Sequence, residues 1–302
     1  MQTPWGEFRV LDAHVHFFSQ RFLASLTSQQ GRTVDEAARF LGWETPPEDP
    51  ADLARAWARE LDAHAVAKAA LIASVPGDEG SVAAAVAACP DRFFGYCMFN
   101  PLEENPGERV HAALASGFRA VCLFPAMHRY AVWDERVRPV FREAARLPGR
   151  AVFVHCGVLS VGVRKKLGLA SPFDMRFSNP IDLHAVALAY PELPFIVPHF
   201  GAGYFREALM LADQCPNVYL DTSSSNNWMR YEGLDLKTVF ARALDVAGAG
   251  RLLFGTDSSF FPRGWNAAVF EAQAKALVEL GVGAQDAQKI FGGNLERLFG
   301  GS

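Results

Sequence analysis

The chain has 302 residues, of which 50% are hydrophobic, and this length favours a single domain over residues 1–302. Its net charge of -4 argues against a nucleic-acid-binding protein, which usually carries a basic face. No apolar run reaches the roughly eighteen residues of a membrane span, and the N-terminal stretch has no signal-peptide pattern. We therefore expect neither a membrane partner nor secretion.

The cysteines are odd in number, lie far apart and form no C-x-x-C pair (Cys89, Cys97, Cys122, Cys156 and Cys215). This pattern is typical of reduced thiols rather than of a disulfide framework. We therefore expect a cytoplasmic protein.

Short apolar runs alternate with amphipathic segments along the chain. Eight runs are expected to be strands, at residues 8–15, 68–74, 93–99, 118–124, 151–155, 195–197, 217–221 and 251–254. Segments with helical spacing follow them, at residues 52–65, 81–88, 106–115, 137–146, 180–189, 204–215, 236–247 and 266–280. Eight such units favour a closed α/β barrel, the (β/α)8 TIM barrel, over an open doubly wound sheet. No Gly-x-Gly-x-x-Gly follows the first strand, which weakens the dinucleotide-binding alternative.

The first strand ends in Asp12-Ala13-His14-Val15-His16. Alternation along a strand directs Asp12, His14 and His16 to one face. Two imidazoles two residues apart can reach a single ion, although a surface pair without an ion has the same pattern.

Two long stretches interrupt the repeat. Residues 17–49 contain Trp43 and several prolines, and a loop of this length is usually a lid, a binding loop or a partner contact. Residues 157–179 contain a basic run that includes Arg164 and Lys165. That run is either a solvated helix face or, because it follows a barrel strand, an anion-binding element.

Polar residues end three later runs: His155 the fifth, His199 the sixth and Asp257 the eighth. The carboxyl ends of barrel strands form one rim, so these side chains are expected to meet His14 and His16 there. Such ligands suit one divalent ion, zinc first, with manganese or iron possible. An ion held in this way lowers the pKa of a bound water toward ~7.

The remaining candidates have different surroundings. His64, His111 and His184 lie in helical segments and are expected to be structural. His128 lies in the loop after the fourth strand, on the rim, and is a candidate for substrate contact. Asp221 ends the seventh strand, but an Asp before Thr-Ser-Ser can equally be a helix or turn cap.

Five motifs occur in a fixed order: Asp-Ala-His-Val-His16, Val-Phe-Val-His155, Val-Pro-His199-Phe-Gly-Ala-Gly, Leu-Phe-Gly-Thr-Asp257 and Gly-Asn-Leu-Glu-Arg-Leu-Phe299. Together they resemble the amidohydrolase superfamily, in the amidohydrolase-related branch that includes aminocarboxymuconate semialdehyde decarboxylase. The likeness covers nearly the whole chain.

The resemblance implies that His14, His16, His155 and Asp257 bind the metal. It also implies that His199 is the catalytic acid or base beside a metal-bound water, which Asp257 orients as a second catalytic residue. Two-metal barrels of this type usually carry a lysine at the end of the fourth strand, and residues 118–125 contain none. We therefore expect a mononuclear site.

The branch contains hydrolases of C–O or C–N bonds, lactonases and nonoxidative decarboxylases. We favour a hydrolase of a small carboxylated molecule. The alternatives are a carboxy-lyase acting on an aromatic or muconate-like acid and, in another class, a metal-free binding barrel. The candidate anchors for an anionic substrate are all basic: Arg164, Lys165, Arg176, Arg206 and Arg263. The long first loop and the apolar C-terminal segment are compatible with a homodimer.

Overall fold

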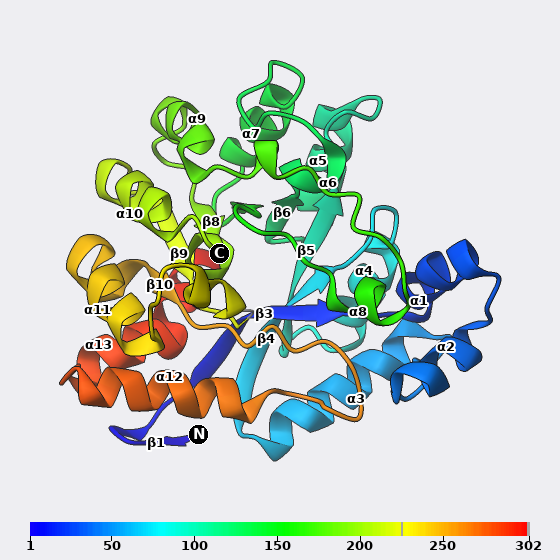
Figure 1. Cartoon of the computed structure of the whole chain (residues 1–302), viewed down its shortest axis with the longest axis horizontal. Helices are drawn as coiled ribbons and strands as arrows, with labels where there is room; N and C mark the ends of the chain where they lie inside the picture. Colours follow the sequence, from blue (N-terminus) through cyan, green and yellow to red (C-terminus); the bar gives the residue numbers. More distant parts are fainter. Residues whose placement is uncertain (225, 301–302) are drawn as a thin grey trace.

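The computed structural model describes residues 1–224 and 226–300. Its centre is a sheet of eight parallel strands in which neighbours along the chain are also neighbours in the sheet (Figure 1). The strands are β3 (Val10–Phe17), β4 (Val66–Ala73), β5 (Phe93–Phe99), β6 (Ala120–Leu123), β7 (Ala151–Val154), β8 (Phe195–Val197), β9 (Val218–Asp221) and β10 (Leu252–Leu253). A short antiparallel hairpin of β1 (Gln2–Thr3) and β2 (Gly6–Glu7) precedes them.

The sheet closes into a barrel through the segment that follows β10. The Ala13 amide of β3 donates to the Phe254 carbonyl (2.8 Å), and the Asp257 amide donates to the His14 carbonyl (2.9 Å). These bonds join the last strand to the first, so the prediction of a TIM barrel is confirmed.

A helix follows each strand on the outside of the barrel, as expected. These helices are α3 (Pro50–Ala63), α4 (Glu79–Ala88), α5 (Pro106–Ala115), α7 (Arg138–Ala145), α9 (His184–Ala189), α10 (Phe205–Gln214), α11 (Leu236–Ala247) and α12 (Ala267–Glu279). Residues at the N-terminus stabilise the first turn of several of these helices. At α11, for example, the Asp235 carboxylate accepts from the Thr238 amide (2.7 Å). Between α5 and α7, the short helix α6 (Pro125–His128) follows β6.

The C-terminal segment forms α13 (Ala284–Gln288), the π-helical turn η7 (Lys289–Gly293) and α14 (Asn294–Phe299). The Phe299 ring lies 5.4 Å from that of Phe94 and 5.8 Å from that of Tyr96, near the start of β5. Leu295 and Phe299 are buried. The apolar residues of this segment therefore cover the amino end of the protein's own barrel.

Residues 17–49, expected to be a loop, are largely helical. They form α1 (Gln20–Thr27), the 3-10 turn η1 (Ser28–Gln30) and α2 (Val34–Leu41). Ser19 caps α1 by accepting from the Phe22 amide (3.0 Å), and Thr33 with Glu36 forms a reciprocal capping box at α2. The loop expectation was wrong because these capped helices have apolar faces that pack on each other.

The basic stretch after β7 also contains a helix, α8 (Gly162–Lys166). Val163 and the adjacent Leu167 are buried with Phe22, Leu23 and Leu26 of α1, in a small cluster separate from the barrel core. Figure 1 shows α8 beside α1, although they are far apart in the sequence. We call α1, α2 and α8 the cap.

Within the described residues, no helix combines the length and apolar character that a membrane crossing requires.

Candidate active site

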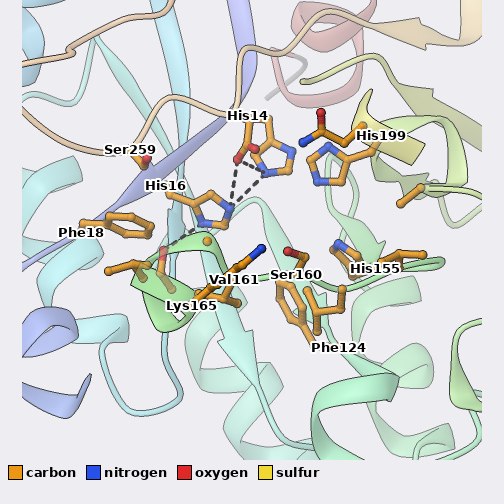
Figure 2. A pocket seen from close by; sticks show the side chains of 18 of the residues that line it. His14, His16, Phe18, Phe124, His155, Ser160, Val161, Lys165, His199 and Ser259 are labelled. Atoms are coloured by element: carbon orange, nitrogen blue, oxygen red, sulfur yellow. Dashed lines mark hydrogen bonds and ion pairs between the residues drawn. The ribbon is translucent and has the colours of Figure 1, made fainter. Parts of the chain in front are cut away.

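The carboxyl ends of the strands surround a cavity of about 520 Å³. Its lining includes the five rim residues expected from the sequence, which are His14, His16, His155, His199 and Asp257. Figure 2 shows the four imidazoles arranged around this cavity. Barrel closure and the order of the strands have therefore brought together side chains that lie far apart in the sequence.

His14, His16 and Asp257 form the tightest part of the site. His14 Nε2 and His16 Nε2 are 3.4 Å apart. Asp257 Oδ1 lies 3.7 Å from His14 Nε2 and 3.4 Å from His16 Nε2. A tetrahedral ion with nitrogen and oxygen ligands at ~2.1 Å separates those ligands by ~3.4 Å. The spacing of these three groups therefore fits a metal ion.

Hydrogen bonds on the far side of each ring place the proton of the neutral imidazole on Nδ1, so that Nε2 is the nitrogen with a lone pair. His14 Nδ1 lies 2.6 Å from Asp221 Oδ2, an atom that only accepts, so this nitrogen carries the proton. The Ser74 hydroxyl donates to the Ile72 carbonyl (3.1 Å) and therefore accepts from His16 Nδ1 (2.9 Å). Two lone pairs then face each other, an arrangement that a cation between them stabilises.

The charges around His14 also favour a cation. Burial opposes protonation of the ring, but the neighbouring Asp221 carboxylate outweighs it and raises the pKa of His14. Burial would likewise raise the pKa of Asp221, but His14 and His199 hold that pKa below its ordinary value. The attraction that favours a proton on His14 would act equally on a metal ion at Nε2.

The ligand atoms of His14, His16 and Asp257 all lie within 4.8 Å of one another, and His155 is not part of this group. Its ring centroid is 5.5 Å from that of His199 and 5.5 Å from that of Phe124. Burial holds the pKa of His155 well below its ordinary value, so the ring is neutral. Its Nδ1 is buried and has no hydrogen-bond partner among the described residues. A neutral imidazole with an unpartnered nitrogen fits a fourth ligand.

His199 has the protonation state of a base. Its Nδ1 faces the hydroxyl of Ser223 at 2.9 Å and the carbonyl oxygen of the same residue at 3.4 Å. Because a carbonyl only accepts, Nδ1 carries the proton and Nε2 is unprotonated. Burial, with a contribution from His14, lowers the pKa of His199, so the ring is neutral near pH 7. Its centroid is 4.9 Å from that of His14.

Two of the rim residues have a backbone conformation that is uncommon outside glycine. His199 has φ 54° and Asp257 has φ 58°. Such residues cost about 1–3 kcal/mol each and persist only where surrounding contacts hold them. At Asp257, one contact is the Arg263 guanidinium, which donates to the Asp257 carbonyl (3.0 Å) and to Ser259 Oγ (2.9 Å).

Asp12 does not join the imidazoles. The pairing of β3 with β4 shifts register between Asp12 and Val15, which interrupts the alternation expected from the sequence. The Asp12 carboxylate instead accepts from Thr256 Oγ1 (2.5 Å) and Trp265 Nε1 (2.8 Å). Burial raises the pKa of Asp12 to about 6 despite these bonds. Asp12 therefore ties β3 to the segment that carries Asp257.

Three of the candidate substrate anchors lie outside the cavity lining. Arg176 pairs with Asp174 (2.6 Å) and Arg206 with Glu207 (2.7 Å), in both cases at the exposed surface. Arg164 donates to a backbone carbonyl of its own loop. Nearby partners thus satisfy all three guanidinium groups away from the cavity.

Lys165 and Arg263 do line the cavity, whereas His128 does not. The lining also includes two cations that the sequence analysis did not single out as anchors, Lys166 and Arg230. Four cationic side chains against the single carboxylate of Asp257 give the cavity the character of an anion site.

Two supporting residues were missed by the sequence analysis. Asp221 was considered as a cap, and it does accept from the Ser223 amide (2.7 Å), but its other oxygen orients His14. Ser74, which follows β4 directly, orients His16. Both stand at strand ends on the rim, and that position is the signal that could have identified them.

One wall of the cavity is aromatic. Phe18 stacks on Phe22 with centroids 3.9 Å apart, and Trp43 stacks on Phe260 at 4.3 Å. Phe18 and Trp43 are 5.7 Å apart and join the two pairs into a continuous row. Three of these four rings belong to the 17–49 stretch, so this stretch contributes to the binding cavity.

A family model described as Amidohydrolase matches residues 11–301 of the chain. Among solved structures, the probable 2-pyrone-4,6-dicarboxylic acid hydrolase of Acinetobacter baumannii, determined with citric acid bound, has a TM-score of 0.65 at 15% identity. The match covers 97% of this chain and 100% of that one. A zinc-bound amidohydrolase of Burkholderia multivorans has a TM-score of 0.63 at 18% identity, with 96% and 99% covered. At these identities the likeness concerns the fold.

A curated relative matches a smaller part of the chain. Protein fluG of Emericella nidulans is 35% identical over 85 residues, which are 28% of this chain and 10% of that protein. The chain therefore matches a small fraction of that relative's length.

Replacing Gly157 with Ala should destabilise the loops that carry His155 and His199. Gly157 has φ +82°, and a Cβ there would overlap the carbonyl oxygens of Gly201 and Ala202. We expect a loss of about 2 kcal/mol or more in the free energy of unfolding, measured by denaturant titration. Gly162→Ala is the matched control, because nothing lies within 4 Å of its added Cβ. Equal stability of the two variants would contradict this account.

Proposed function

The chain belongs to the amidohydrolase family, and from this premise we propose that it is a metal-dependent hydrolase of small carboxylated molecules. The observation that carries the proposal is the convergence of three ligand atoms, from His14, His16 and Asp257, at the spacing of a coordination shell. The zinc-bound and dicarboxylate-hydrolase structures that share the fold support it by analogy.

In this proposal His14, His16, His155 and Asp257 hold one divalent ion, most simply zinc, with manganese or iron as alternatives. When bound, the ion would polarise a substrate oxygen and make a water more acidic. A single ion is favoured because Phe124, and not a lysine, follows β6 and stacks against His155.

The chain's own groups then move the proton. The unprotonated Nε2 of His199 takes a proton from the attacking water as its oxygen bonds to the acyl carbon. The same nitrogen returns the proton to the departing oxygen or nitrogen as the C–O or C–N bond breaks. Asp257 accepts a hydrogen bond from the water and orients it.

The substrate class follows from the charge of the lining. Lys165, Lys166, Arg230 and Arg263 outnumber Asp257, the carboxylate among the lining residues. A small acid is thus attracted into the cavity, with its reacting group toward the imidazoles. The aromatic wall also suits a flat unsaturated acid, so a nonoxidative carboxy-lyase is the second candidate.

The decisive experiment couples metal analysis to a substrate screen. The zinc-supplied protein should contain one ion per chain and hydrolyse a lactone or amide that bears a carboxylate, and chelation should abolish turnover. Two ions per chain would reject the mononuclear site. Carbon dioxide release from hydroxybenzoates or muconate-like acids, without hydrolysis, would favour the carboxy-lyase. A metal-free chain without turnover would favour a binding barrel.

His199→Ala should abolish turnover while the ion is retained, because this ring supplies the proton acceptor and not a ligand. A loss of about 100-fold or more in kcat is expected for removal of a general base. Metal content is measured on the same sample, and loss of the ion would make His199 a ligand instead. His111→Ala, an exposed histidine on α5, is the control.

Asp221→Asn should weaken metal binding about 10- to 100-fold, because the amide holds the His14 ring and its tautomer less firmly. The change is measured as the free zinc concentration at half saturation in a chelator competition. Asp245→Asn, at an exposed position of helix α11, should leave this concentration unchanged. Equal affinities for Asp221→Asn and the wild type would remove Asp221 from the site.

A further inference from the structure

We propose that Lys165 of the cap selects substrates that carry a second carboxylate, remote from the reacting group. The inference rests on the proposed function and adds the residue that determines its specificity. Lys165 lies on the five-residue helix α8, outside the barrel. Its position therefore does not follow from the end of a barrel strand.

Lys165 has the position that this role requires. It lies on α8, above the carboxyl ends of the strands, and lines the cavity that contains the imidazoles. Figure 2 shows its side chain extending into the cavity toward them. A substrate held by the histidines at one end would present its other end to this ammonium group.

The Lys165 ammonium group is also available to bind an anion. Arg263 is engaged with the Asp257 carbonyl and Ser259, and the Arg230 guanidinium lies 5.2 Å over the Tyr231 ring. By contrast, the Lys165 carbonyl accepts from the Gly168 amide (3.0 Å), but no hydrogen bond or ion pair of its ammonium group is found within residues 1–224 and 226–300. An ammonium on a flexible stem can follow a carboxylate in several positions, which suits a selective rather than a catalytic group.

The neighbouring Lys166 is a natural comparison. Successive residues of a helix point about 100° apart, so the side chains of Lys165 and Lys166 leave α8 in different directions. Lys165 extends toward the imidazoles, so we expect a substrate held there to meet Lys165 more directly than Lys166. Neutralising Lys165 should therefore matter more.

The cap holds α8 in place. Val163 and Leu167 pack against Phe22, Leu23 and Leu26 of α1, so the apolar side of α8 is fixed on the 17–49 insertion. Lys165 is thus positioned by a small core of its own, separate from the core that positions the ligands. Selectivity and chemistry then depend on different parts of the chain.

The test is isothermal titration of the zinc-loaded protein with isophthalate and citrate, and with isophthalamide as the uncharged analogue of the first. The wild type should prefer isophthalate to isophthalamide. Lys165→Gln should weaken the binding of both carboxylates about tenfold or more, without affecting isophthalamide. Lys165→Arg should stay within about threefold of the wild type, and Lys166→Gln should lose less affinity than Lys165→Gln.

Three outcomes would overturn the proposal. They are unchanged carboxylate binding by Lys165→Gln, an equal loss in Lys166→Gln, and a wild type that binds neither carboxylate or does not discriminate between isophthalate and its amide. Metal content and turnover of the wild type test the proposed function independently of the role of Lys165. A wild type that holds zinc and hydrolyses substrates, with Lys165→Gln unchanged, refutes the role of Lys165 alone.

Discussion

The site depends on the hydrogen bonds that join the first strand of the barrel to the segment after the last. Residues 254–258 add to β3 by main-chain bonds, and the Asp12 carboxylate fastens this junction by accepting from Thr256 and Trp265. Asp257 lies in that segment, so its carboxylate reaches His14 and His16 only because the barrel closes there. The left-handed backbone of Asp257 is held by the same contacts, which is how a strained residue persists at a rim that is otherwise regular. The contacts that close the barrel are therefore also the contacts that bring the three candidate metal ligands together.

Beneath the imidazoles, a layer of buried polar groups decides which nitrogen atoms face the cavity. Asp221 fixes the proton on His14, Ser74 fixes it on His16, and Ser223 fixes it on His199. Each ring then presents an unprotonated Nε2 inward, although the rings come from different strands. Burial keeps His16 and His199 neutral, whereas the carboxylate of Asp221 makes the position of His14 favourable for positive charge. This difference among chemically identical side chains separates a cation-binding end of the cavity from the base beside it.

The barrel and the five rim residues could be predicted because both follow from periodicity. Short apolar runs between amphipathic segments specify parallel strands, and parallel strands carry their final residues to one rim. The roles of the other polar candidates could not be predicted, because each depends on which of several possible partners the side chain binds in the folded protein. Arg176 and Arg206 are basic residues and therefore candidate anchors for an anion, but each has a carboxylate within two residues that satisfies it at the surface. Asp12 shares a pattern with His14 and His16, yet a register shift in β3 gives it different partners. The helices of the 17–49 stretch had recognisable caps at Ser19 and Thr33, but the prolines around them favoured a loop.

The residues for catalysis and the residues for substrate recognition belong to separately packed parts of the chain. The barrel core positions the ligands and the base through strands that are hydrogen-bonded on both sides, and a change in one strand disturbs its neighbours. The cap has its own apolar cluster and contributes Phe22 and Lys165 to the same cavity, and the residues next to its helices contribute the rings of Phe18 and Trp43. Substitutions in it can alter the shape and charge that meet a substrate without moving the imidazoles. In a fold that places varied chemistries on one scaffold, selectivity is expected to reside in such an added element rather than in the strands. The 17–49 insertion is therefore as informative about the substrate as the histidines are about the reaction.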